Sequence, residues 1–538
     1  MTDAKMPSVE HVENTPGSDV VEPASPPEQQ EATRFMLYFS LWMALSAWIC
    51  NFDSGYGGIV LLMPSYNKAF GTCHMVPDKT TGLLVEQCHV TATQQSLISV
   101  TSIFIAVGGA LAGMTGRYLG RRGTIQCGCV LIIIGAAGML GTSGNFLNYM
   151  VCKCIGGVGI GMLFAASPIY GAECVTPHRR GMLMALYNVG LAFGNVAAAA
   201  VCAGSSNILG DWAWKVPIVC QIPLGIIYGV GIMMFPESPR WLLVNGQEEK
   251  ARRSFGKFYQ KAPYSPEITA QVHEVQNYIE FEKAAGSTAS WTEIFHRNDI
   301  RRTLVSGMIL IGLAITGIQF VVPYAAIFLA GVGIHNPYLI NVIVAVCILA
   351  GTFFGPFIIE YGGRRFAMLA GYTGMSACML IFSAVSTGLG SAAATSKSVL
   401  VAFLCIWAFI FGGFIGSSVW LGSAEMHAVR LRTYGQACTT TVYSTFAFGC
   451  SFWTPYMLNA EYGNMGTNVG YFYFGVTFVM AALTFFFVPE TARLTLEQID
   501  DYFASGRPAW KTGTRRNRRI AGGTEWDVHH TADGAKGE

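Results

Sequence analysis

One acidic side chain stands inside a long apolar stretch near the start of the chain. Asp53 lies near the middle of the run at residues 36–66. A lone carboxylate at the centre of a bilayer costs several kcal/mol unless it is paired or protonated, so such a residue is a functional candidate by default. The chemistry it offers is the uptake and release of a proton, and the alternative is a static contact that fixes helix packing.

The cysteines offer a second kind of chemistry at one place only. Most of the 15 cysteines lie in apolar stretches, where Cys behaves as a small hydrophobic residue. Cys73 and Cys88 instead lie in a polar segment that the topology below places outside the cell, where a disulfide would persist. The sequence leaves a bridge and two free thiols equally open.

Signatures of enzymes and of nucleotide-driven pumps are missing. The sequence contains no Gly-x-x-x-x-Gly-Lys-Ser/Thr motif, so nothing indicates ATP as a driving force. It also shows no nucleophile–base constellation, metal-ligand cluster or cofactor fingerprint. We therefore expect no enzyme, no metal and no cofactor, and no nucleic-acid partner.

The elements that position these residues follow from composition. Hydrophobic residues make up 52% of the 538 residues and charged residues 12%, about half the charged share of soluble domains. Lipid is the simplest solvent for so much apolar surface. Residues 1–32 are rich in Glu, Pro and Ser, contain no apolar core of a secretory signal, and are expected to be disordered.

Twelve apolar stretches are long enough to cross a bilayer as helices. Spanning about 30 Å of hydrocarbon takes roughly 20 residues in a helix, the form that satisfies every backbone hydrogen bond internally. An all-α membrane protein follows from this pattern. The stretches run approximately over residues 36–66, 94–115, 124–142, 147–170, 181–203, 214–235, 303–330, 338–359, 366–387, 399–422, 435–457 and 469–488.

The positions of Lys and Arg predict the orientation. With both tails in the cytoplasm, 29 of the 34 basic residues fall on the inner side, and cytoplasmic loops are expected to carry that excess. We divide the chain into a cytoplasmic tail, a six-helix bundle, a cytoplasmic linker of short amphipathic helices, a second bundle and a second cytoplasmic tail. These parts are residues 1–35, 36–235, 236–302, 303–488 and 489–538.

Three motifs occur twice at a nearly constant offset. Gly120-Arg121-Arg122 recurs as Gly363-Arg364-Arg365, Glu173…Arg180 recurs as Glu425…Arg432, and Pro236-Glu237-Ser238 recurs as Pro489-Glu490-Thr491. Duplicated halves in a transporter place the substrate between them, near the midplane.

These motifs resemble the sugar porters of the major facilitator superfamily, and the fungal members most. The resemblance rests on residues 236–242, 489–491, 167–173 and both Gly-Arg-Arg loops, and it covers about residues 36–503. It implies two six-helix bundles with an intracellular helical segment. It also implies transport of a sugar-like solute by alternating access, driven by protons, in the plasma membrane.

The acidic and basic residues of the repeated motifs are expected to form a cytoplasmic gate. Planar Arg side chains pair well with carboxylates, and such pairs would latch the outward-open state when the halves close. The alternative is that these arginines form no latch and reflect only the excess of basic residues on the cytoplasmic side. The gate residues are Arg121, Arg122, Glu173, Arg180, Glu237, Arg240, Arg364, Arg365, Glu425, Arg432 and Glu490.

The resemblance also implies a coupling pair and a substrate pocket. Proton-coupled members pair an Asp at the place of Asp53 with an Arg, where this chain has Lys153. Leu313 and Ala314 replace an amide pair of hexose carriers, so the pocket is expected to be less polar and to suit a modified sugar, polyol, oligosaccharide or sugar-derived metabolite. The expected pocket residues are Asn188, Asn195, Gln319, Tyr324, Trp420 and Tyr443.

Two other functions remain open at this point. The altered pocket is compatible with a proton-driven exporter of a secondary metabolite on the same fold. A nutrient sensor that does not transport would be expected to have a long cytoplasmic tail, and only about residues 489–538 follow the last helix.

Overall fold

The computed structural model describes residues 33–517 except for short gaps. The tail expected to be disordered, residues 1–32, lies outside the described part, as does the end of the second tail. The residues outside the described part are 1–32, 78–83, 143, 176–179, 287–290, 297–298, 335, 391–392, 429–430, 460, 493, 495–497, 500–501, 504, 506–507, 515–516 and 518–538.

Six long helical segments form the first bundle in the part that the structure describes. Gly190 and Gly194 face the backbone of Ala44 and Trp48, which lets two of these helices approach closely. The segments are α1 (Arg34–Ile59) with η1 (Val60–Leu62), α3 (Ala92–Ile98) with α4 (Thr101–Tyr118), α5 (Gly120–Leu140), α6 (Phe146–Cys174), α7 (Arg180–Ser205), and α8 (Trp212–Gly231) with η3 (Ile232–Met234).

The second bundle repeats this plan with two interrupted helices. Gly317 has a φ of +99° and separates α12 from α13, and a π-helical turn separates α16 from α17. The segments are α12 (Ile300–Ile315) with α13 (Ile318–Gly331), α14 (Pro337–Gly362), α15 (Arg364–Leu389), α16 (Ala394–Ile410) with η5 (Phe411–Gly416) and α17 (Ser417–Glu425), α18 (Arg432–Leu458), and η7 (Gly466–Asn468) with α19 (Val469–Phe487).

Of the described helical segments, eleven are long and apolar enough to cross a membrane, and α18 is the twelfth long helix. Its sequence is more polar because it carries many hydroxyl side chains. Thr441, Ser444 and Thr454 donate to the carbonyl groups four residues earlier, at 2.9, 3.0 and 2.6 Å. These local bonds satisfy the hydroxyl groups inside the helix, which fits α18 for the same environment as its neighbours.

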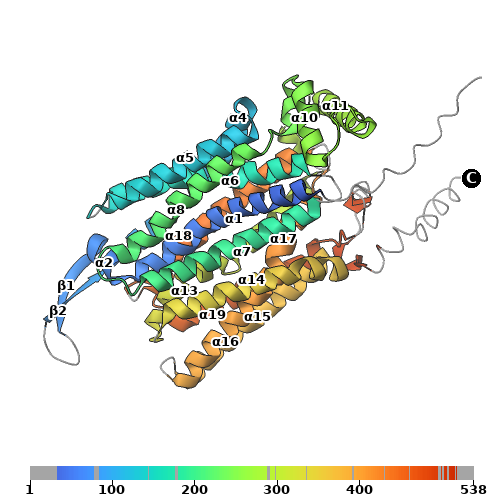
Figure 1. The fold of residues 1–538 in the computed structure, drawn as a ribbon. Helices are drawn as coiled ribbons and strands as arrows, with labels where there is room; N and C mark the ends of the chain where they lie inside the picture. The colour runs from blue at the N-terminus through green and yellow to red at the C-terminus, as the bar shows by residue number, and fades with distance from the viewer. Residues whose placement is uncertain are drawn as a thin grey trace, which may run out of the picture.

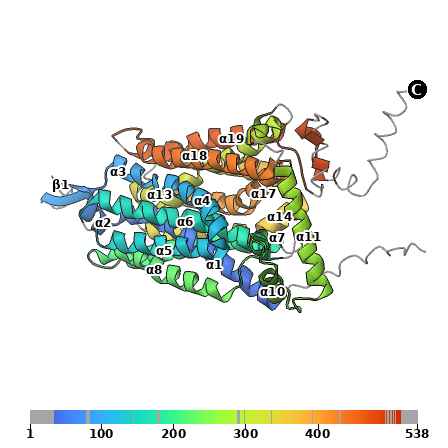
Figure 2. The same cartoon turned by 90° about the horizontal axis from the view of Figure 1, so that it is seen from above.

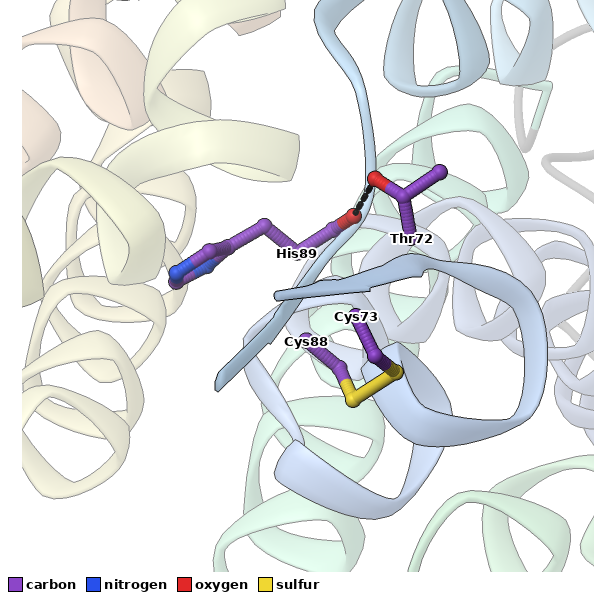
Figure 3. Close-up of a disulfide and its surroundings, with 4 residues drawn as sticks. All are labelled: Thr72, Cys73, Cys88 and His89. Atoms are coloured by element: carbon purple, nitrogen blue, oxygen red, sulfur yellow. Dashed lines mark hydrogen bonds between the residues drawn. A yellow bond between two sulfur atoms is a disulfide. The ribbon is translucent and has the colours of Figure 1, made fainter. Parts of the chain in front are cut away.

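A two-stranded hairpin projects from one end of the bundles, called the hairpin end here (Figure 1). It follows α2 (Pro64–Phe70) and consists of β1 (Thr72–Pro77) and β2 (Leu84–His89), which are antiparallel. Cys73 and Cys88 are directly opposite each other in the register and form a disulfide (Figure 3). The bridge that the sequence left open is therefore present.

Short helices cover the opposite end, called the linker end (Figure 1). They are α9 (Pro239–Val244), α10 (Glu248–Tyr259), α11 (Pro266–Gly286) and η4 (Trp291–Phe295), and η8 (Ala509–Lys511) follows the last bundle helix. Phe258 of α10 is buried and packs on Phe35 and Phe39 of α1, with ring centroids 5.4 and 5.0 Å apart. One of the expected amphipathic helices is thus present as α10, and α11 runs across this end of the molecule (Figure 2).

Candidate functional site

Asp53 and Lys153 meet inside the first bundle. Lys153 Nζ on α6 lies 3.3 Å from Oδ1 and 3.4 Å from Oδ2 of Asp53 on α1. Only 5% of Asp53 and 4% of Lys153 is exposed. Burial of single charges is expensive, and pairing is the usual way to reduce that cost. The structure therefore contains the contact that the family resemblance implied.

Two neutral side chains also contact this pair. Gln221 on α8 donates from Nε2 to Asp53 Oδ1 at 2.8 Å. The ring centroid of Tyr56 lies 4.8 Å from Lys153 Nζ. The sequence analysis missed both residues because it looked for partners of Asp53 only among charged groups. A usable signal existed for Gln221, which is a single amide in an otherwise apolar part of α8.

The first copy of the repeated motifs forms a compact polar cluster at the linker end. Arg121 binds both carboxylate oxygens of Glu173, at 2.8 and 3.0 Å, and Ser238 Oγ donates to the same carboxylate at 2.6 Å. Glu237 accepts hydrogen bonds from the backbone N–H groups of Arg121, Arg122 and Ser238. It therefore satisfies free N–H groups at the start of α5.

Burial raises the pKa of the Glu237 carboxyl above its ordinary value. The backbone hydrogen bonds from Ser238, Arg122 and Arg121 act in the opposite direction but do not cancel the effect of burial. Within this cluster, Glu237 is thus more ready than an exposed glutamate to hold a proton.

The second copy repeats the same contacts. Arg364 Nη2 lies 2.9 Å from Glu425 Oε1, and Thr491 Oγ1 donates to the other Glu425 oxygen at 2.6 Å. Glu490 accepts from the backbone N–H groups of Arg364 and Arg365 at 2.9 and 3.2 Å. The two Gly-Arg-Arg loops, the two helix-end glutamates and the two Pro-Glu turns therefore form equivalent clusters.

The expected latch between the halves concerns the outward-open state and stays a prediction. The Arg121–Glu173 and Arg364–Glu425 pairs each join two residues of the same bundle. The reason is that each Gly-Arg-Arg loop lies beside the helix end and the turn of its own repeat. Arg240 lies in α9, while Arg180 and Arg432 begin α7 and α18 with side chains outside the described part.

The residues expected in the substrate pocket fall into separate groups. The rings of Trp420 on α17 and Tyr443 on α18 meet edge to face, with centroids 5.2 Å apart, and 37% of Trp420 is exposed. Gln319 Oε1 accepts from Ser451 Oγ on α18 at 3.4 Å. These pairs place aromatic and amide groups of the second bundle along α18.

The amides expected from the fifth span lie in α7 of the first bundle. Asn195 is buried, and its side chain lies beside Gly55 of α1. Asn188 is half-buried, two turns earlier on the same helix. Leu313 and Ala314 on α12 are both buried, so these two positions are as apolar in the structure as in the sequence.

An apolar groove elsewhere does not coincide with these residues. Its volume is about 660 Å³, and side chains of α12, α18 and α19 line it, including Leu304, Val442 and Val479. Leu304 and Val479 are both exposed. None of the six expected pocket residues lines this groove, so we do not assign it to the substrate.

Hydrogen bonds between the two bundles gather at the hairpin end. Ser96 Oγ on α3 donates to Phe452 O at 2.8 Å, and Tyr324 OH on α13 donates to Gln95 O at 3.3 Å. Tyr456 OH lies 3.5 Å from Thr93 Oγ1. Among the described residues, every side-chain hydrogen bond between the bundles involves α3. The bundles are therefore joined at the hairpin end, and Tyr324 belongs to this contact.

Two bundles of long apolar helices with a buried ion pair define a multi-pass membrane protein of the major facilitator class. The chain belongs to the sugar (and other) transporter family, whose model matches residues 39–503. Members of this family are transporters and not enzymes.

Curated relatives of similar length support this assignment. The chain is 26% identical over 479 residues to the probable glucose transporter rco-3 of Neurospora crassa, covering 87% of this chain and 79% of that protein. It is 27% identical over 489 residues to the high-affinity glucose transporter ght2 of Schizosaccharomyces pombe, covering 89% of both chains.

Solved structures share the fold. The inward-open xylose transporter XylE from E. coli aligns with a TM-score of 0.68 and 21% identity, covering 87% of this chain and 99% of that chain. The proton:xylose symporter XylE bound to 6-bromo-6-deoxy-D-glucose also gives a TM-score of 0.68, with 20% identity and coverage of 88% and 100%. The predicted twelve-helix architecture is confirmed by this likeness.

Proposed function

We propose that this protein imports a sugar or a sugar-like solute together with protons by alternating access. The observation that carries the proposal is the buried contact of 3.3 Å between Asp53 and Lys153. A carboxylate that can exchange its ionic partner for a proton offers a way to couple proton movement to a conformational change. Because the driving force is the proton gradient, no cofactor and no ATP are needed.

The relatives support a sugar as substrate. They include glucose transporters and the high-affinity fructose transporter ght6, and XylE, which shares the fold, is a proton:xylose symporter. The edge-to-face pair of Trp420 and Tyr443 supplies apolar contact area, and Asn188, Asn195 and Gln319 supply amides. These five residues, together with Tyr324, are our candidates for the substrate site.

We place the protein in the plasma membrane with the linker end in the cytoplasm. Support comes from the concentration of Lys and Arg in the linker and tails. A disulfide in the hairpin fits an oxidising exterior. In this orientation, bundles joined at α3 correspond to a transporter closed on the outside. The linker helices would brace the bundles, and the two Arg–Glu clusters would serve as the cytoplasmic gate.

Transport by purified protein in liposomes tests the coupling. Radiolabelled glucose, fructose and xylose are offered with and without an acidic exterior. We expect wild-type protein to accumulate a sugar only with the pH gradient. Asp53→Asn should reduce this accumulation by at least about tenfold, because the variant removes the group that takes the proton.

An exchange assay separates coupling from folding. Asp53→Asn protein that still exchanges labelled for unlabelled sugar is folded and binds substrate. Undiminished accumulation by Asp53→Asn would contradict the proposal. Accumulation that requires an acidic interior would instead identify the exporter that the sequence left open.

A further inference from the structure

The ionic partner of Asp53 is farther from its carboxylate than a neutral partner is. Ammonium–carboxylate hydrogen bonds are usually about 2.7–2.9 Å long, whereas Lys153 Nζ stays 3.3 and 3.4 Å from the two carboxylate oxygens. The neutral amide of Gln221 is closer, at 2.8 Å. Gln221 therefore holds the carboxylate more closely than its ionic partner does.

Lys153 also has a second partner. Tyr56 follows Asp53 by three residues on α1, so both side chains lie on the same face of that helix. The Tyr56 ring is fully buried, and its centroid lies 4.8 Å from Lys153 Nζ, inside the range of about 6 Å for a cation–π contact. The ammonium thus contacts an aromatic face as well as the carboxylate.

These two contacts matter when the carboxylate takes up a proton. Asp53 then loses its negative charge, and Lys153 becomes a buried cation without an anion, which is unfavourable in an apolar interior. An aromatic face continues to attract the cation. The glutamine amide can donate to a carboxylate, and after rotation its oxygen can accept from a carboxylic acid.

We propose that Gln221 and Tyr56 are positioning residues that hold Asp53 and Lys153 separately, so that the ion pair opens when Asp53 is protonated. This inference rests on the proposed proton coupling. One proton moves from water at the outer side to a carboxylate oxygen of Asp53, and Lys153 keeps its own protons throughout. Release of that proton on the other side restores the ion pair.

Other titratable groups near the pair are thiols and phenols, which ordinarily titrate above neutral pH. Among the described residues, Asp53 and Lys153 are therefore the two charged groups of this site. The surrounding titratable groups come from three helices packed together and are Cys50 and Tyr56 on α1, Tyr149 and Cys154 on α6, and Cys202 on α7.

The first test substitutes the amide. Gln221→Leu removes a donor to the carboxylate and favours its protonated form, so the midpoint of the pH profile of gradient-driven uptake should move up by about one unit, or roughly tenfold in proton affinity. Gln126→Leu is the matched control. Gln126 on α5 donates from Nε2 to Gly229 O of α8, the helix that carries Gln221, at 3.4 Å and away from the pair. The control should keep the wild-type profile.

A second substitution keeps the test valid if Gln221→Leu does not fold. Gln221→Glu has nearly the same shape and places a second carboxyl group beside Asp53. Two neighbouring carboxyl groups disfavour double ionisation, so this variant should also move the midpoint upward. A wild-type midpoint in the folded Leu or Glu variant overturns the role of Gln221.

The Tyr56 variants should move the profile in the opposite direction. Tyr56→Leu removes the aromatic face that stabilises the unpaired ammonium, so protonation of Asp53 becomes harder and the midpoint moves to lower pH. Tyr56→Phe keeps the ring and should restore the wild-type midpoint. Equal midpoints for the Leu and Phe variants overturn the role of Tyr56.

Failure of this inference is distinct from failure of the proposed function. Wild-type protein whose uptake ignores an imposed pH gradient contradicts the proton coupling itself. Wild-type protein that responds, together with Gln221 and Tyr56 variants that follow its profile, contradicts only the positioning role. Opposite shifts from the two residues are not expected from a general loss of packing, which would affect both variants alike.

Discussion

The two bundles carry the same cluster at the linker end, but different segments cover the two copies. In the first bundle, Ser254 Oγ of α10 donates to the backbone oxygen of Glu237 at 2.7 Å. In the second, Asn517 Nδ2 donates to the backbone oxygens of Glu490 and Ala492 at 2.9 and 3.1 Å. The first cover therefore comes from the linker, whereas the second comes from the segment after the last bundle helix.

The comparison separates what the repeat preserves from what it leaves free. Both copies keep the Arg–Glu pair, a hydroxyl on the paired glutamate and a second glutamate on the start of a helix. In each copy, the covering side chain belongs to the segment that follows the Pro-Glu turn. Residues 508–514 and Asn517 accordingly have a structural role: Thr512 Oγ1 accepts from Glu490 N at 2.9 Å, and Thr514 Oγ1 donates to Gly362 O at 2.8 Å.

Removal of the paired arginines should give the largest effect and should affect both bundles alike. Arg121→Leu and Arg364→Leu each leave a mostly buried glutamate without its cation. We expect each to lower the free energy of unfolding by about 2 kcal/mol, less than for a fully buried pair because the arginines are partly exposed.

Thermal unfolding in detergent measures this loss. Arg253→Leu is a control, because its pair with Glu249 is exposed on both sides, at 68% and 63%, and should contribute less than about 1 kcal/mol. A loss confined to one of the two arginine variants would show that the clusters are not equivalent.

Substitution of the glycine before each arginine pair should have the next largest effect. Gly120 and Gly363 have φ values of +76° and +96°, and an added Cβ would press on the carboxylates of Glu237 and Glu490. Alanine in this conformation costs about 1–2 kcal/mol before any steric contact. Gly144→Ala is the matched control, with a φ of +91° and open space around the added atom. Losses no greater than the control would contradict the carboxylate contacts.

Removal of the covers should produce smaller and separate effects. Ser254→Ala should loosen the first cluster, and Asn517→Ala the second, each by about 1 kcal/mol per hydrogen bond lost. Hydrogen–deuterium exchange at the starts of α5 and α15 distinguishes the two sites. Faster exchange at both starts in either variant would mean that the covers are coupled through the linker end.

The smallest effect concerns the pH dependence of the first cluster. Because burial raises the pKa of Glu237, the stability linked to its protonated form is complete below the ordinary glutamate pKa of about 4.3 and is lost as pH rises through the higher folded value. Glu237→Gln cannot ionise. The melting temperature of this variant minus that of wild type should therefore increase from acidic to neutral pH. A constant difference would indicate that Glu237 titrates normally.

Much of the architecture was predictable because apolar length and charge placement report directly on a bilayer. The helices around Asp53 and Lys153 lie where the apolar stretches indicated, and α10 has the expected buried aromatic face. The breaks at Gly317 and in η5 were not expected, because an apolar stretch reads as continuous whether its helix is interrupted or not.

Partner choice was less predictable. The sequence identified the arginines and glutamates of both clusters, but sequence spacing does not tell which carboxylate a long side chain will reach, and the pairs in this structure form within each bundle. The latch between the halves stays a prediction. Tyr324 stays a candidate for the pocket, and the sequence did not indicate that its hydroxyl donates to Gln95 O between the bundles. Contacts between distant helices depend on their relative rotation, which no single stretch encodes.

The sequence alone determined that the chain is a duplicated set of membrane helices with a buried carboxylate, because hydrophobic length and repeated motifs are local properties. Only the tertiary structure decided that Gln221 and Tyr56 flank the ion pair, that each Arg–Glu cluster closes within its own bundle, and that α3 joins the bundles at the hairpin end. Each of these contacts joins residues far apart in the chain or depends on how helices rotate against one another, and that arrangement is fixed by packing across the whole molecule.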